Sequence, residues 1–119
     1  MADPRFIGTL ILHNPSDVKK MTVGKDFSFE DSRGILWTVH KGDVTDGASI
    51  PNQLKLFIGG SYQTPYLKAA ILHDVYCQNK THSWQDTDRM FYEAMRTNGV
   101  GRTKATLMWL AVYTFGPHW

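Results

Sequence analysis

Short apolar runs separated by turn residues dominate the first third of the chain. Phe6–Leu12 is rich in β-branched and aromatic residues and is followed by an Asn-Pro-Ser-Asp segment, which is typical of a turn. Phe27–Phe29 alternates apolar and polar positions, and an Asp-Ser-Arg-Gly turn connects it to Ile35–Val39. This pattern predicts a small antiparallel β-meander over residues 5–40.

The apolar spacing becomes helical in the second half of the chain. Thr64-Pro65 is typical of a helix start, and no Gly or Pro interrupts residues 66–78. The capping-box spacing of Ser83–Asp86 begins a second helix, which ends before an Asn-Gly pair. A third helix, over about 103–114, is nearly all apolar and is expected to pack between the other elements. The fold class predicted is therefore α+β, with an N-terminal antiparallel β-meander packed against three C-terminal α-helices.

A single domain is expected over residues 1–119. This length, with 42% hydrophobic and 20% charged residues, is ordinary for one globular core. The predicted meander (5–40) and the three helices (64–116) are joined by residues 41–63, which hold several Gly, Asp and Pro. We expect this motif loop to be structured, because loops of such length inside compact domains are often functional.

Charge and cysteine content exclude several classes of function. The formal net charge is only +2, and Lys and Arg are scattered along the chain, so no nucleic-acid partner is expected. Cys77 is the single cysteine, which rules out an intrachain disulfide and a CxxC redox motif. The polar N-terminus lacks the layout of a secretory signal, and the apolar stretch 105–115 is too short for a transmembrane segment.

The second predicted helix places a carboxylate among core residues. Trp84, Asp88, Phe91 and Met95 follow i, i+4, i+7 and i+11 spacing and so share one stripe. A buried carboxylate needs a hydrogen-bond partner. His73 lies on the crowded face of the first predicted helix, and the short connection makes the two helices antiparallel neighbours. We therefore predict a hydrogen bond between His73 and Asp88, which would fix the imidazole tautomer.

Two further carboxylates are candidate metal ligands. Asp74 follows His73 directly and points about 100° away around the helix. The segment 45–51 combines Asp46 with a Gly turn, a hydroxyl and backbone carbonyls, which are oxygen ligands of the kind that Ca²⁺ and Mg²⁺ prefer. Asp46 and Asp74 are thus predicted joint ligands. Zn²⁺ held by His73, Asp74 and Asp88 is the alternative.

Each candidate also has a simpler interpretation. A buried His–Asp contact is often a structural hydrogen bond, and Asp46 before a glycine is by default a turn. Ser49 is a candidate hydroxyl, although local capping is the commoner role because no GxSxG elbow surrounds it. Cys77 is expected to be a small buried hydrophobe. Arg89 is either a surface charge or an anion-binding group.

Several motifs follow one another along the chain in a distinctive order. They are Thr45-Asp46-Gly47-Ala48-Ser49-Ile50-Pro51, Ala69-Ala70-Ile71-Leu72-His73-Asp74, Asp88-Arg89-Met90-Phe91-Tyr92-Glu93-Ala94-Met95, Gly99-Val100, Phe115-Gly116 and Trp119. In this order of motifs the chain resembles the domain-of-unknown-function family numbered 1353, met mostly in tailed bacteriophages and prophages. The resemblance covers nearly the whole chain and implies a phage setting without implying an activity.

A more distant resemblance concerns mechanism. The His-Asp dipeptide, Tyr76 soon after it and a DxxF segment on an antiparallel helix are similar to secreted phospholipases with a His–Asp dyad. In those enzymes the His is the general base for a water molecule, the adjacent Asp holds Ca²⁺ and the distant Asp orients the His. The resemblance places these roles on His73, Asp74 and Asp88, as an analogy of site and not of descent.

Two functions of different classes are consistent with these features. The first is a phage-encoded, metal-assisted hydrolase acting on an ester or amide bond, for which a cell-envelope substrate is one candidate. The second is a non-enzymatic virion or tail component that binds other phage structural proteins. Both predict synthesis in the host cytoplasm and, for the second, association with the virion.

Overall fold

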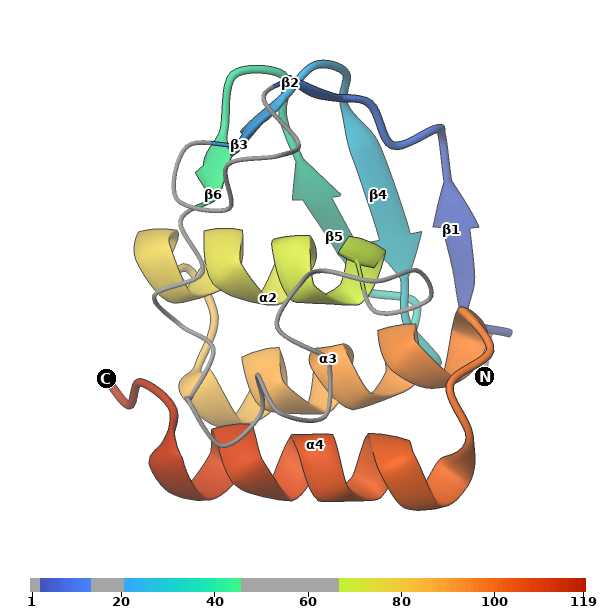
Figure 1. Ribbon diagram of the computed structural model, residues 1–119, viewed down its shortest axis with the longest axis vertical. Coiled ribbons are helices and arrows are strands. Elements are labelled where there is room, and N and C mark those ends of the chain that lie inside the picture. Colours follow the sequence, from blue (N-terminus) through green and yellow to red (C-terminus); the bar gives the residue numbers. More distant parts are fainter. Residues whose placement is uncertain (1–2, 14–20, 46–66) are drawn as a thin grey trace.

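The computed structural model describes residues 3–13, 21–45 and 67–119. Within these residues six short strands precede three helices, and Figure 1 shows the strands at one end of the molecule, with the helices stacked in successive layers below them. The elements are β1 (Arg5–Ile7), β2 (Leu12–His13), β3 (Met21–Val23), β4 (Phe27–Glu30), β5 (Leu36–Val39), β6 (Val44–Thr45), α2 (Leu67–Asn79), α3 (Trp84–Thr97) and α4 (Arg102–Phe115). The predicted α+β class is confirmed.

The strands form two small antiparallel sheets, with the orders β1-β4-β5 and β2-β3-β6. In the first sheet Phe29 of β4 lies opposite Phe6 of β1 and Trp37 of β5. The run Phe6–Leu12 was predicted as one strand, and this prediction was wrong. Gly8 has a φ of +91°, so the chain turns there and its two halves join different sheets. Strands β3 and β6 were not predicted.

A buried carboxylate organises the β4–β5 hairpin. Asp31 is fully buried, and its Oδ1 accepts hydrogen bonds from the backbone N–H groups of Arg33 (2.9 Å) and Ile35 (3.0 Å). Its Oδ2 accepts a hydrogen bond from Nε1 of Trp37 at 3.0 Å. The turn is therefore connected to the largest side chain of the core.

Local sequence signals define α3 well. Ser83 caps the helix, because its Oγ accepts a hydrogen bond from the backbone N–H of Asp86 at 3.1 Å. Gly99 adopts the positive φ of +95° that ends the helix, as the Asn-Gly pair predicted. For α2, the predicted start at Thr64-Pro65 lies outside the described residues. Most of the predicted motif loop lies outside them as well.

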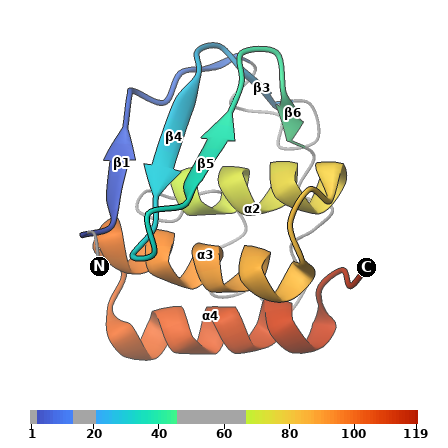
Figure 2. The same cartoon turned by 180° about the vertical axis from the view of Figure 1, so that it is seen from behind.

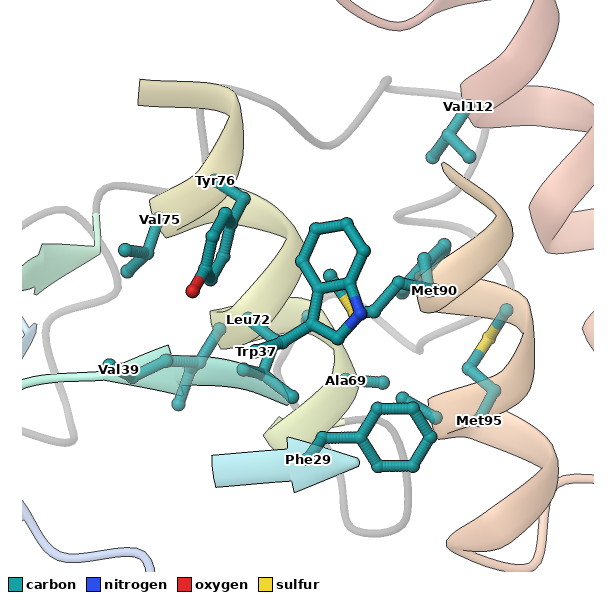
Figure 3. Packing of buried hydrophobic residues seen from close by; sticks show 14 of the residues in the cluster. Phe29, Trp37, Val39, Ala69, Leu72, Val75, Tyr76, Met90, Met95 and Val112 are labelled. Atoms are coloured by element: carbon teal, nitrogen blue, oxygen red, sulfur yellow. The ribbon is translucent and has the colours of Figure 1, made fainter. Parts of the chain in front are cut away.

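The core lies between the first sheet, α2 and α3. Trp37 sits at its centre, and Figure 3 shows it between α2 and the methionines of α3. Tyr76 meets its ring edge-on, with 4.9 Å between the ring centroids. The largest fully buried side chains are Trp37, Phe27, Phe29, Phe91, Ile71, Leu72, Met90, Met95, Met108 and His73.

Helix α4 forms the outermost layer. In both ribbon views it lies beyond α3, on the side away from the sheets (Figures 1 and 2). Only Ala105, Met108 and Val112 of this helix are buried. The expectation that the apolar third helix packs between the other elements was therefore wrong, because α4 contacts α3 along one side and its opposite face, with Leu107 and Leu110, is exposed.

Candidate functional site

The central helix carries the candidate site. In α2 every residue from Ala69 to Cys77 is buried, because the helix runs between the sheets and α3 and has almost no solvent-facing side. Most helices expose one polar face. In α2 the polar side chains of His73 and Asp74 are instead held inside the protein, with 0% and 1% exposure.

His73 contacts Asp88 across the α2–α3 interface. The distance between His73 Nε2 and Asp88 Oδ1 is 2.7 Å, and Asp88 is only 2% exposed. The predicted contact is thus present. The ring of His73 also packs against Phe91, with 4.8 Å between the centroids. With Nε2 bonded to the carboxylate, Nδ1 is the nitrogen left for another partner.

Asp88 carries a carboxylate that is only partly satisfied. Its Oδ2 is buried and has no hydrogen-bond partner among the described residues. An unsatisfied buried acceptor costs about 1–3 kcal/mol of folding free energy. Such atoms are uncommon in folded proteins, and each one needs an explanation beyond packing.

The contact between Cys77 and His73 was not predicted. The cysteine sulfur lies 3.7 Å from both Nδ1 and Nε2 of the imidazole. A sulfur equally far from both ring nitrogens lies on the lone-pair axis of neither, so this geometry is packing rather than an aligned thiol–imidazole pair. Cys77 follows His73 by four residues on the same helix, and this i, i+4 spacing could have predicted the contact.

Asp74 is linked to the end of the second sheet. Gln78 Nε2 donates to Asp74 Oδ2 at 3.1 Å and to the carbonyl oxygen of Val44 at 3.0 Å. Val44 belongs to β6, so one amide group joins α2 to the strand that leads into the predicted motif loop. Sequence reasoning missed Gln78, although its i+4 position relative to Asp74 was a signal.

Two candidates cannot be compared with this geometry. Asp46 and Ser49 lie outside the described residues. Thr45, which directly precedes Asp46 in the sequence, is described and fully buried. In the described part of the chain, no group of three or more His, Cys, Asp or Glu side chains is arranged to hold a metal ion.

Tyr76 has a structural partner. Its hydroxyl oxygen accepts a hydrogen bond from the backbone N–H of Thr38 at 2.8 Å. Thr38 is in β5, the edge strand of the first sheet. The bond satisfies an edge N–H and attaches α2 to the sheet.

Tyr76→Phe should therefore lower the free energy of unfolding by about 1–2 kcal/mol, because the N–H of Thr38 loses its acceptor. Urea denaturation measures this change. Tyr92→Phe is the matched control, since Tyr92 lines an open groove between α3 and α4 and is only half-buried. Equal stability of the two variants would contradict this role for Tyr76.

Arg89 lies apart from the dyad. It lines an open groove of about 360 Å³ between α3 and α4, together with Gln85, Tyr92, Thr106 and Trp109. Its Nε is 3.6 Å from Glu93 Oε2, and its side chain is 50% exposed. Although Arg89 follows Asp88 in the sequence, the two side chains point about 100° apart around α3, and Arg89 is half exposed whereas Asp88 is buried. The structure therefore does not bring Arg89 to the His73–Asp88 contact.

None of the helices in the described residues is both long and apolar enough to span a bilayer. This finding agrees with the expected lack of a transmembrane segment there.

Comparison with known proteins identifies relatives. Two proteins from Sinorhizobium fredii, both called uncharacterized (y4iH and y4jT), are 40% and 46% identical to the chain over 105 and 97 residues. These alignments cover 88% and 82% of this chain but 44% and 29% of the relatives, so the chain spans less than half the length of either. No solved structure matches. The model of the family described as "Protein of unknown function (DUF1353)" matches residues 21–112, and the chain belongs to this family.

Proposed function

We propose that the chain is a hydrolase domain in which His73 and Asp88 form a general-base dyad. The observation that supports this most is the 2.7 Å contact between His73 Nε2 and Asp88 Oδ1. The other carboxylate oxygen, Asp88 Oδ2, is buried and has no hydrogen-bond partner among the described residues. Burying an imidazole and a carboxylate in one helix interface is costly, and such pairs concentrate at functional sites.

The two side chains would have different roles. Asp88 orients the imidazole and stabilises its protonated form, so it acts as the positioning residue. His73 takes the proton of an attacking water at Nδ1, because Nε2 is bonded to Asp88. The water oxygen then adds to the carbonyl carbon of an ester or amide, and the protonated imidazole returns its proton to the leaving alcohol or amine as the C–O or C–N bond breaks. A cell-envelope component encountered by a phage is the proposed substrate class.

Asp74 is the proposed ligand of a divalent cation, together with Asp46. The amide nitrogen of Gln78 lies 3.1 Å from Asp74 Oδ2 and 3.0 Å from the oxygen of Val44, between a carboxylate and a carbonyl group. Oxygen donors of these two kinds suit Ca²⁺ or Mg²⁺, and with a His ligand Zn²⁺ becomes an alternative. When bound, the cation would polarise the scissile carbonyl.

A second candidate function is favoured by a different observation. His73 is 0% exposed and Asp88 is 2% exposed, which suits a polar contact that only joins two helices. In that case the chain would be a non-enzymatic phage virion or tail component, bound to other structural proteins. The dyad would then affect stability and no reaction.

Thermal denaturation with added CaCl₂, MgCl₂ or ZnCl₂ tests the metal proposal. A cation at about 100 times its dissociation constant should raise Tm by at least about 5 °C, since binding stabilises only the folded state. Asp74→Asn should abolish this rise. Asp3→Asn, which removes the charge of an exposed carboxylate, should leave it unchanged.

The reaction itself is tested on p-nitrophenyl esters and on purified bacterial envelope fractions. We expect His73→Ala to remove at least about 99% of the measured hydrolysis. The hydrolase proposal fails if no cation shifts Tm and no fraction is cleaved. Copurification with tail proteins from a phage lysate would then support the structural candidate.

A further inference from the structure

The outer face of α4 carries apolar side chains that nothing in the described chain covers. Leu107 is 45% exposed and Leu110 50%, whereas the helix buries only three side chains. Surface leucines occur singly in most proteins, but two on one stripe of one helix form a small patch. Figure 1 shows α4 at the edge of the molecule, with α3 on one side of it only.

The exposed stripe has the spacing of a helix–helix seam. Thr103, Leu107, Leu110 and Thr114 are separated by four, three and four residues, which is the alternation of a coiled-coil contact line. Both threonines are exposed as well. The stripe therefore lies opposite the buried positions of α4, where a second helix could pack.

This stripe is also palindromic. Reading it in either direction gives Thr, Leu, Leu, Thr with the same spacing. In an antiparallel pair of identical helices, Leu107 would meet Leu110 of the other copy, and Thr103 would meet Thr114 of the other copy. A two-fold contact requires this kind of self-complementarity, in which residue i meets j and j meets i.

We propose that the Thr103–Leu107–Leu110–Thr114 stripe is a self-association surface on which a second copy of this chain docks, with the two α4 helices antiparallel. Each leucine pair buries apolar surface that is otherwise in water. The inference is independent of any activity at His73.

Charge supports the antiparallel orientation. Helix α4 has no acidic residue in its first turn, no basic residue in its last turn and no side-chain hydrogen bond at its N-cap, Gly101. Arg102 and Lys104 in the first turn oppose the helix dipole of their own helix. In an antiparallel pair these cations would lie beside the carboxyl end of the partner's α4, where the dipole is negative and cations are favoured.

The interface would be small. A helix of 14 residues is about 21 Å long, so one stripe buries less than the standard interface of about 800 Å² on each partner. We therefore expect a reversible dimer that forms over the micromolar to sub-millimolar range, rather than a permanent one.

Sedimentation equilibrium over this concentration range tests the proposal. The wild-type chain should show a monomer–dimer equilibrium, and Leu110→Glu should weaken it by at least about tenfold, because a carboxylate would face a leucine. Leu36→Glu is the matched control. Leu36 is a leucine of β5 with 52% exposure, and its replacement should leave the equilibrium unchanged.

Cross-linking tests the orientation. A mixture of Thr103→Cys and Thr114→Cys chains, treated with a short bis-maleimide, should give cross-linked dimers of the two variants. Thr103→Cys alone should give few, because in an antiparallel pair its partner position is Thr114.

Three results would overturn the proposal. One is a monomer at every concentration, and another is a dimer that Leu110→Glu leaves intact. The third is efficient cross-linking of Thr103→Cys with itself, which indicates parallel helices. Circular dichroism of each variant confirms that it is folded.

Discussion

Trp37→Ala should lower the free energy of unfolding by about 3–5 kcal/mol, which is a large fraction of the stability of a domain of this size. Two effects combine in this variant. The indole is fully buried between β5, α2 and α3, so its loss leaves a cavity that rigid neighbours fill only in part. Its loss also removes the hydrogen-bond donor of Asp31 Oδ2. Urea denaturation measures the change.

Trp37→Phe separates the two effects. Phenylalanine keeps much of the ring volume but has no N–H group, so Asp31 Oδ2 loses the same partner while the cavity is smaller. We expect a loss of about 2–3 kcal/mol, between the wild type and the alanine variant. If Trp37→Phe were as stable as the wild type, the hydrogen bond to Asp31 would make no net contribution.

The helices were more predictable than the strands for a physical reason. The ends of α3 depend on neighbouring residues, namely the Ser83 cap and the left-handed Gly99, and such signals are local. Strands β2 and β6 have two residues each, too few for a period to appear in the sequence. The break at Gly8 depends on pairing with β4, a contact that only the folded chain provides.

Some contacts of the candidate site were likewise predictable from the sequence, and others were not. The contact between His73 and Asp88 follows from two helical periods and a short connection, which are all visible in the sequence. The link from Asp74 through Gln78 to Val44 was not visible in the sequence, because it depends on where β6 lies against α2 in the folded chain. The role of Tyr76 also depends on a distant strand, since its partner Thr38 is 38 residues away. A contact between two consecutive helices with a short connection is thus predictable, and a bond between a helix and a strand distant in the sequence is not.

Removing both members of the dyad should cost less than removing one. His73→Leu leaves the Asp88 carboxylate buried with no partner for either oxygen among the described residues, so we expect a loss of about 3–5 kcal/mol. Asp88→Leu leaves a buried imidazole unpaired and should cost about 1–3 kcal/mol. In the double variant no buried polar group remains at this point of the interface, and its stability should be close to that of the wild type or above it.

This double-mutant cycle separates the two candidate functions when it is measured by urea denaturation together with hydrolysis. A coupling free energy of at least about 2 kcal/mol reports the contact itself, and additive single effects would contradict it. A double variant that folds as well as the wild type but hydrolyses nothing would mean that the chain keeps a destabilising pair for its reaction. If the same variant retained all measurable function, the dyad would have no catalytic role, because its chemistry would be gone while the fold remained.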